Sequence, residues 1–266
     1  MTGGPLRADA PVPAWVAALA AGEVVRPVWR NHQGGQTFEI GAGERRRFVK
    51  WAPEGSGINL AAEAARLEWA AAFTPVPRLL GADADDAGSW IITCALPGQM
   101  AVTSRWKAEP RTAVTAIGQG LRALHEALPA RACPFTWSAS HRLADVRRRA
   151  RLGRLDPARW HHDHQNLGAP AALRLLADIP PAGQPVVCHG DACAPNTLLT
   201  EDGRCSGHVD LGSLGVADRW ADLAVATWST TWNYGPGFQT RLLDAYGIAP
   251  DPDRTRYYRL LYDLSP

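Results

Sequence analysis

Lysine is scarce in this sequence. Of 28 basic residues only two are lysines, Lys50 and Lys107, and all the others are arginines. A genome biased toward arginine codons would explain the excess. Such a bias makes each remaining lysine a candidate for a position where a compact ammonium group is needed and a planar guanidinium is not equivalent. Lys50 is the stronger candidate, because it lies in the apolar segment Phe48-Val49-Lys50-Trp51.

Three other features are also absent or weak, and each excludes a class of protein. The formal net charge is only +2, whereas nucleic-acid binders usually carry a stronger basic imbalance. No run reaches the ~18 apolar residues of a membrane span, and residues 1–13 lack the apolar core of a secretory signal. Five cysteines form no C-x-x-C pair, which indicates reduced thiols in the cytoplasm and no disulfide framework or zinc site.

The first third of the chain reads as strands plus one helix. Apolar patterning and glycine-rich breaks predict strands over residues 24–29, 37–40, 47–51 and 90–95. Asn59 is a candidate N-cap for a helix over residues 60–72. The sequence therefore predicts an N-terminal lobe over residues 1–96, with a hinge at residues 93–98.

The rest of the chain has mainly helical periodicity. Helices are expected over residues 112–128, 141–152, 169–177, 219–231, 238–246 and 254–261. Short strands are expected over residues 185–188 and 207–211, on either side of residues 196–199. Residues 97–266 are thus predicted to form a second, largely helical lobe.

An ordered polar set lies between these short strands. It consists of His189-Gly190-Asp191, then Asn196, then Asp210-Leu211-Gly212. Phosphoryl transfer needs an oriented acceptor hydroxyl and metal ions that neutralise charge on the phosphates. The spacing is that of a kinase catalytic-loop Asp, an Asn five positions later and a following Asp-x-Gly. We therefore expect Asp191 to be catalytic, and Asn196 and Asp210 to supply oxygen ligands to Mg²⁺.

Lys50 and Glu63 supply the nucleotide half of the same pattern. Kinases pair a strand lysine with a helix glutamate, and the lysine contacts the phosphates of ATP. Gly34-Gly35 joins two predicted strands where a phosphate-covering loop would lie, although an ordinary hairpin turn uses the same residues. The alternative for Lys50 is a solvated strand lysine with an unrelated surface glutamate.

These motifs resemble the aminoglycoside O-phosphotransferase family, especially its 3′ group. The similarity is carried by residues 187–196, by residues 207–224, and by Tyr257-Tyr258-Arg259-Leu260-Leu261 near the end. The resemblance implies an α+β, two-lobed protein-kinase-like fold, with an antiparallel sheet plus one helix in the N-lobe and a mainly helical C-lobe. It also implies ATP and Mg²⁺, and transfer of the γ-phosphate to an aminoglycoside hydroxyl, the 3′-OH, conferring resistance.

The resemblance further implies where the two substrates bind. Adenine would be held by hinge backbone groups near Thr93, Cys94 and Leu96. A cationic amino-sugar would meet an acidic cleft, to which Asp163, Asp263 and the terminal carboxylate of Pro266 would contribute. Family analogy also suggests that Asp222 braces the catalytic loop. We expect a monomer or weak dimer.

The sequence departs from the family pattern at the acceptor side. Ser213 follows Asp-x-Gly where 3′ members usually have arginine, and Ala194 stands where some members have an acid. The last residues, Tyr262-Asp263-Leu264-Ser265-Pro266, contain one acid where the family often has an Asp-Glu pair. A kinase of another small hydroxylated metabolite or antibiotic therefore remains the alternative.

Two clusters admit more than one interpretation. His161-His162-Asp163-His164 could bind a metal, but adjacent histidines need not converge on one ion, and an exposed loop is the simpler hypothesis. Trp228 and Trp232, four residues apart on a predicted helix, either pack in the core or line the acceptor mouth.

Overall fold

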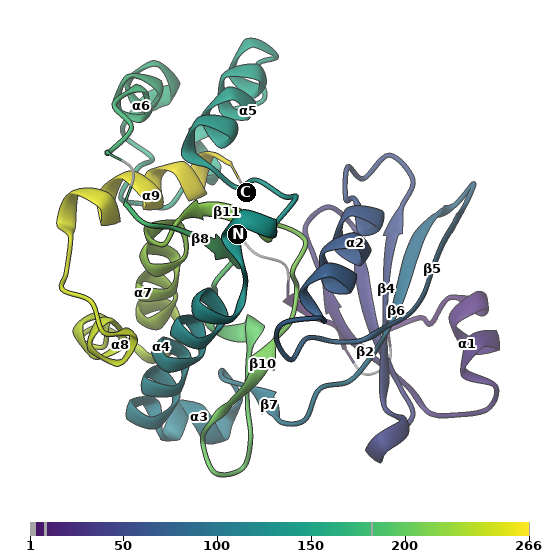
Figure 1. Ribbon diagram of the computed structural model, residues 1–266. Coiled ribbons are helices and arrows are strands. Elements are labelled where there is room, and N and C mark those ends of the chain that lie inside the picture. The colour runs from purple at the N-terminus through teal and green to yellow at the C-terminus, as the bar shows by residue number, and fades with distance from the viewer. Residues whose placement is uncertain (1–3, 8–9, 182, 266) are drawn as a thin grey trace. The chain divides into compact units, whose positions relative to one another are not determined.

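The computed structural model describes residues 4–7, 10–181 and 183–265, and Figure 1 traces the chain through them. The chain divides into two compact units, Met1–Leu96 and Pro97–Pro266. The first combines a sheet with helices and the second is mostly helical, so the predicted α+β class is confirmed.

The first unit is built on a six-stranded antiparallel sheet in the order β1-β2-β3-β4-β6-β5. Its strands are β1 (Gly4–Pro5), β2 (Val25–Arg30), β3 (Gln36–Ile40), β4 (Arg47–Pro53), β5 (Leu79–Asp85) and β6 (Gly88–Cys94). All four predicted strands are present within one or two residues. β5 was not predicted, because its sequence LLGADAD is polar and largely exposed and so lacks apolar alternation.

Successive side chains of β4 point to opposite faces of this sheet. Phe38 pairs with Val49, and both are buried in a core cluster with Val16 and Ala20 of helix α1 (Ala14–Ala20). Lys50 follows Val49 and therefore points to the other face, where helix α2 (Leu60–Ala70) packs. The alternation of side chains along β4 thus places Val49 on the apolar face of the sheet and Lys50 on the opposite face.

The first unit contains one helix more than the sequence predicted. α2 begins where expected, and the Asn59 side chain accepts a hydrogen bond from the Ala62 amide at 2.9 Å. α1 was missed because it has only seven residues and no side-chain cap at Pro13. Its stability comes from packing Val16 and Ala20 against the sheet, which is a tertiary effect.

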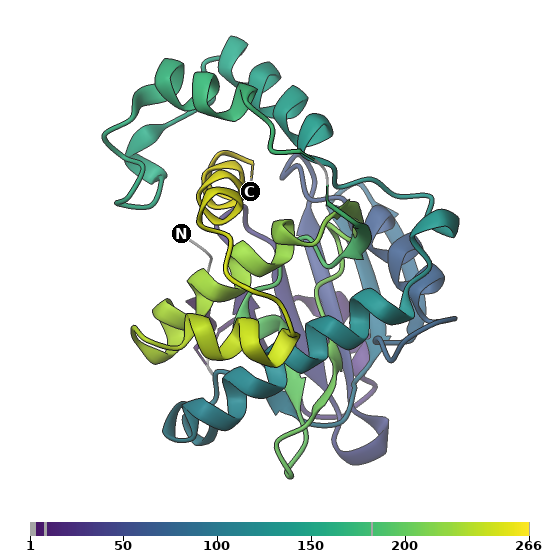
Figure 2. The same ribbon diagram turned by 60° about the vertical axis from the view of Figure 1, so that its left-hand side comes forward.

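The second unit contains seven α-helices among the described residues. They are α3 (Ser104–Ala108), α4 (Pro110–Ala127), α5 (Ala139–Arg151), α6 (Gly168–Ala177), α7 (Trp220–Tyr234), α8 (Gln239–Tyr246) and α9 (Pro252–Leu264). α7 packs against α8 and α9, and almost every residue of its first three turns is buried. Figure 2 shows α5 and α6 together, with α9 lying beside them. The short α3 was not predicted, whereas the other six were.

Two small sheets complete this unit. β10 (Cys205–His208), β9 (Thr197–Leu199) and β7 (Gln99–Met100) form one, and β11 (Gly215–Asp218) pairs with β8 (Pro185–Cys188) in the other. β8 has the predicted bounds, but the predicted strand over residues 207–211 starts earlier and ends at His208. Residue 210 leaves the strand because its backbone is left-handed. Within the described part of the chain, no helix has both the length and the apolar content needed to cross a membrane.

Candidate active site

The segment between β8 and β9 carries the first half of the predicted motif. β8 ends at Cys188, and a sharp turn follows at Gly190, whose φ is +87°. A Cβ at this position would lie 2.3 Å from the main-chain oxygen of Ser213. Only glycine therefore permits the turn that brings Asp191 out of the buried strand.

One buried carboxylate fixes this turn. Asp222, at the start of α7, accepts the amide protons of His189 at 2.6 Å and Gly190 at 2.9 Å. It also lies 2.9 Å from Nε2 of His125, whose Nδ1 is 2.8 Å from the Tyr246 hydroxyl. Burial raises the pKa of Asp222, but His125, His189 and the Gly190 amide together outweigh it, so the net pKa is below the ordinary value.

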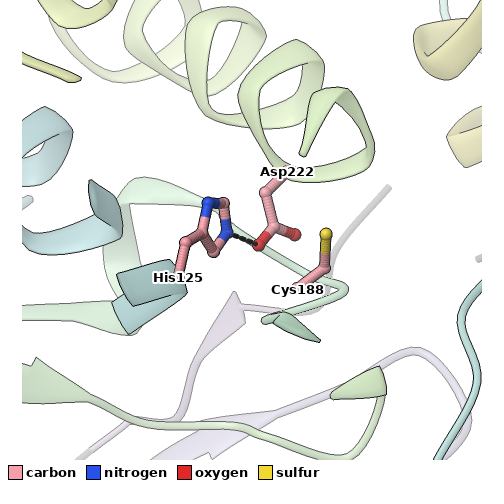
Figure 3. Close-up of side chains that lie close together, drawn as sticks. All are labelled: His125, Cys188 and Asp222. Atoms are coloured by element: carbon pink, nitrogen blue, oxygen red, sulfur yellow. Dashed lines mark hydrogen bonds and ion pairs between the residues drawn. The ribbon is translucent and has the colours of Figure 1, made fainter. Parts of the chain in front are cut away.

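Cys188 lies beside the same carboxylate, as Figure 3 shows. Burial raises the pKa of its thiol well above the ordinary value, and nearby Asp222 raises it further. The thiol donates to the main-chain oxygen of Asp218 at 3.3 Å. Asp222 and His125 are therefore hydrogen-bonded to each other behind the loop, and the Cys188 thiol lies beside them.

Asp191 is held from two sides. The side-chain amide of Asn196 donates to Oδ2 of Asp191 at 3.0 Å and to its main-chain oxygen at 2.9 Å. The phenol hydroxyl of Tyr262, in α9, donates to Oδ1 at 2.8 Å. The sequence placed Asp191 and Asn196 together but missed Tyr262, because 71 residues separate it from Asp191 and no local pattern links them.

Asp210 is joined to the same loop through its neighbour. The Val209 amide donates to the main-chain oxygen of Asn196 at 3.0 Å, and Nε2 of His189 donates to the Val209 oxygen at 2.9 Å. Asp210 itself is exposed and has a φ of +68°, a region that non-glycine residues rarely adopt. The structure thus brings Asp191, Asn196 and Asp210 to one loop cluster in the second unit.

His208 lies under this cluster as a buried neutral group. Its ring packs edge-on against that of His189, with 5.8 Å between the centroids. Burial lowers the pKa of His208 to about 3, with a smaller contribution from His189. His208 therefore adds no charge behind the loop at neutral pH.

In the first unit, the predicted lysine–glutamate pair is formed. Nζ of Lys50 lies 2.6 Å from Oε1 of Glu63, with side-chain exposures of 23% and 8%. The Gly34-Gly35 turn is closed by Asn31, whose side chain accepts the Gly35 amide proton at 2.8 Å, and Gly34 has a φ of +93°. This geometry matches both an ordinary hairpin turn and a loop that could cover phosphates.

The predicted hinge residues lie at the end of β6. Thr93 is buried, and the Cys94 amide donates to the main-chain oxygen of Arg78 at 2.9 Å. The main-chain oxygen of Leu96 accepts from the Arg46 guanidinium at 3.0 Å. These contacts fix the direction in which the chain leaves the sheet.

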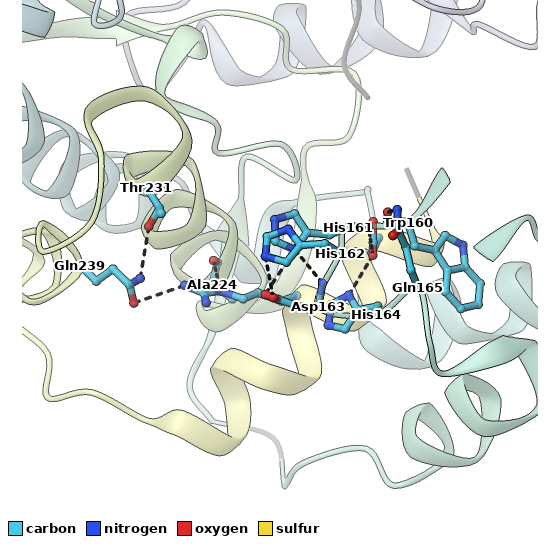
Figure 4. Close-up of polar contacts among 11 residues, drawn as sticks. Trp160, His161, His162, Asp163, His164, Gln165, Ala224, Thr231 and Gln239 are labelled. Carbon is cyan, nitrogen blue, oxygen red and sulfur yellow. Dashed lines mark hydrogen bonds and ion pairs between the residues drawn. The ribbon is translucent and has the colours of Figure 1, made fainter. Parts of the chain in front are cut away.

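Two of the three predicted acceptor residues, Asp163 and Asp263, contact the histidines of residues 161–164, which Figure 4 shows. Oδ2 of Asp263 accepts the His161 amide proton and lies against Nδ1 of His164, both at 2.8 Å. Asp163, about half exposed, contacts the rings of His161 and His162 at 3.3 and 3.1 Å. Pro266, the third predicted acceptor residue, lies outside the described residues.

The loop hypothesis for residues 161–164 is only partly correct. The side chain of His162 is 79% exposed, but the ring of His161 packs on Trp228 with 4.3 Å between centroids. The two tryptophans also differ: Trp228 is 4% exposed, and Trp232 is 43% exposed with its ring 5.0 Å from that of Trp228. One therefore belongs to the core, while the other presents an aromatic surface.

Comparison with known proteins identifies the family. Residues 25–258 match the phosphotransferase enzyme family. The chain belongs to this family. An aminoglycoside 3′-phosphotransferase of Streptomyces fradiae is 37% identical over 231 residues, covering 79% of this chain and 81% of that one. A streptomycin 3″-kinase of Streptomyces griseus is 36% identical over 253 residues, covering 90% and 91%.

The phosphotransferase also matches a solved structure over most of its length. That structure is the aminoglycoside phosphotransferase APH(3″)-Id from Streptomyces rimosus ATCC10970 in complex with ADP and streptomycin. The TM-score is 0.75, the identity is 29%, and 95% of this chain and 97% of that one are covered. The predicted kinase-like fold and phosphotransferase class are thus confirmed.

The support role of Asp222 leads to a first prediction. Asp222→Asn should destabilise the phosphotransferase by about 3 kcal/mol. The new side-chain amide would point an N–H group at the N–H donors of the loop and of His125, which now bond to the Asp222 carboxylate. Turnover should fall as well, since the Gly190 turn would shift. Chemical unfolding and kcat measure the two effects. Asp244→Asn, an exposed substitution on α8, should change neither, and equal behaviour of the two variants would contradict the support role.

Proposed function

We propose that this enzyme transfers the γ-phosphate of ATP to a hydroxyl of an aminoglycoside, with Asp191 as the catalytic carboxylate. The observation that carries the proposal is the loop cluster in which Asp191, held by Asn196 and Tyr262, is tied to Asp210. The two relatives named above, which act on aminoglycosides by name, support the acceptor class.

In the proposed step, a bond forms between the acceptor oxygen and the γ-phosphorus while the bond to the β-phosphate oxygen breaks. The products are the phosphate ester and ADP. Tyr262 donates to Oδ1 of Asp191 and Asn196 donates to Oδ2, and a carboxylate oxygen can accept more than one hydrogen bond. Asp191 can therefore orient the acceptor hydroxyl and receive its proton as the new bond forms.

Asn196 and Asp210 fit the proposed Mg²⁺ site by the chemistry of their donors. Nδ2 of Asn196 donates both hydrogen bonds to Asp191. The side-chain oxygen of Asn196 is therefore the atom that would bind the metal ion. Asp210 adds an exposed carboxylate oxygen. When bound, Mg²⁺ would neutralise charge that develops on the phosphates.

The first unit is proposed to hold the nucleotide. Lys50, oriented by Glu63, would contact the phosphates, and the backbone of Gly34 and Gly35 would cover them. Adenine would meet the main chain at Thr93, Cys94 and Leu96. The ADP in the solved relative supports nucleotide binding by this fold.

The acceptor is proposed to bind near the segment over residues 161–164. Asp163 offers an exposed carboxylate, and Asp263 a second one that is mostly covered by His161 and His164. We keep Pro266 as a third proposed contact. Trp232 adds a half-exposed ring against which a sugar face could pack. We also propose a monomer or weak dimer.

We propose the 3′-hydroxyl as the acceptor group, with resistance as the biological result. A specific observation also favours the 3″ position: the streptomycin 3″-kinase aligns over 90% of the chain, against 79% for the 3′-phosphotransferase. A kinase of another small hydroxylated metabolite or antibiotic is the third candidate.

The catalytic role of Asp191 predicts a large kinetic effect. Asp191→Asn should lower kcat at least ~10²-fold and leave ATP binding nearly intact, because the amide cannot accept the hydroxyl proton as a carboxylate does. Steady-state kinetics and nucleotide titration measure the two quantities. Asp202→Asn, in an exposed turn, is the matched control. Retention of more than a tenth of wild-type kcat would remove Asp191 from this role.

The Lys50 proposal predicts that activity and stability can be separated. Lys50→Met should abolish most turnover and cost about 2 kcal/mol of stability, because Glu63 keeps a buried charge without its lysine. Replacing both residues, Lys50→Met with Glu63→Leu, should recover the stability but not the turnover. Lys107→Met, at an exposed site, is the control. Recovery of turnover in the double variant would refute the phosphate contact.

The acceptor position is tested with three antibiotics. A 3′-phosphotransferase should modify kanamycin, which has a 3′-hydroxyl, and should not modify tobramycin, which lacks it. A 3″-type enzyme should instead modify streptomycin. ADP release and the mass and NMR spectrum of the product identify the modified position. Inactivity toward all three, and toward other aminoglycosides, would favour the metabolite-kinase alternative.

A further inference from the structure

We infer that Tyr262 is the positioning residue of Asp191, holding the carboxylate in the orientation that receives the acceptor hydroxyl. The inference rests on the proposed catalytic role of Asp191. Its basis is the 2.8 Å contact between the Tyr262 hydroxyl and Oδ1 of Asp191, made from a helix near the end of the chain. No sequence motif links the two residues.

The proton of this contact belongs to Tyr262. Burial raises the pKa of the phenol well above its ordinary value, and the neighbouring Cys193 and Asp191 raise it further, so the hydroxyl stays protonated. The Cys193 sulfur, 3.5 Å from the hydroxyl, is the competing acceptor. Burial also raises the pKa of the Cys193 thiol well above its ordinary value, so it remains a neutral and weak acceptor. Asp191 therefore receives the hydrogen bond.

The two donors on Asp191 restrain different motions. Asn196 lies on the same loop, five residues away, and moves with Asp191 if the loop moves. Tyr262 belongs to α9, and two nearby residues of the same helix, Leu261 and Leu264, are buried in the core. The Tyr262 hydroxyl is thus anchored outside the loop. It can hold Asp191 in place even if the loop shifts, which the bond from Asn196 cannot do. An off-line shift of a reacting group by about 1 Å can cost ~10²-fold in rate.

A tyrosine at position 262 also differs from an acidic residue in its effect on the charge beside Asp191. An acidic side chain at residue 262 would place a second negative charge beside Asp191, and such a like charge raises the pKa of a neighbouring carboxyl group. A neutral phenol donates a hydrogen bond without adding charge. Tyr262 therefore holds the carboxylate and leaves it available as a proton acceptor.

The first test removes one oxygen atom. Tyr262→Phe should lower kcat about 10–10²-fold and change the KM for ATP less than twofold, because nucleotide binding does not use Asp191. Acceptor-dependent transfer should fall more than basal ATP hydrolysis. Tyr257→Phe is the matched control: this tyrosine is buried in the same helix, and its hydroxyl donates to the Leu176 main-chain oxygen at 3.1 Å. A kcat within twofold of wild type for folded Tyr262→Phe overturns the inference.

A double-mutant cycle tests whether Tyr262 acts through Asp191. In an Asp191→Asn background, adding Tyr262→Phe should cost less than twofold in the residual rate, because the oriented carboxylate is already lost. A further tenfold loss would mean that Tyr262 acts elsewhere, which overturns the inference. An Asp191→Asn enzyme of nearly normal activity would instead defeat the proposed function, so the two failures are distinct.

A spectroscopic measurement keeps the inference testable if Tyr262→Phe does not fold. The Tyr262 hydroxyl proton should give a slowly exchanging, downfield proton NMR signal in the wild-type enzyme, because it is bonded to a carboxylate. In Asp191→Asn the signal should move upfield or disappear. A signal that stays unchanged in Asp191→Asn, or no such signal in the wild type, overturns the inference.

Discussion

The loop that carries Asp191 depends on the buried carboxylate of Asp222. Two consecutive amides, those of His189 and Gly190, donate to it from the loop, and His125 approaches it from α4. A buried charge is costly unless its hydrogen bonds are satisfied, so this network forms only when α4, α7 and β8 are in place together. The position of Asp191 is therefore a consequence of the assembly of the whole second unit, and folding and activity should respond together to changes at Asp222.

The proposed catalytic groups are drawn from elements with different roles. Gly190 provides the sharp turn, Asn196 binds Asp191 within the loop, and Tyr262 binds it from α9. The loop contacts are local and short-ranged, whereas Tyr262 connects the carboxylate to a helix whose apolar side is in the core. Such a division keeps the Asp191 carboxylate ordered although the loop cluster is partly exposed at Asp210.

Charged side chains are neutralised in different ways in the two units. In the first, strand alternation presents Lys50 on the face opposite Val49, and Glu63 neutralises the partly buried ammonium. In the second, the Asp263 carboxylate on the proposed acceptor side is already bonded to His161 and His164. An acceptor bound there would rely on Asp163 and on aromatic surface as well as on charge, which separates this face from a purely acidic cleft.

The sequence alone determined the α+β class, six of the helices in the second unit, the N-cap at Asn59 and the ordered set Asp191, Asn196, Asp210. Each of these depends on periodicity or on spacing within a short segment, which physical chemistry constrains locally. It missed α1 and β5, which are stabilised by the sheet and not by their own patterns. Only the tertiary structure placed Tyr262 against Asp191 and bonded Asp222 to His125, because side chains 71 and 97 residues apart meet only when distant helices pack around one core.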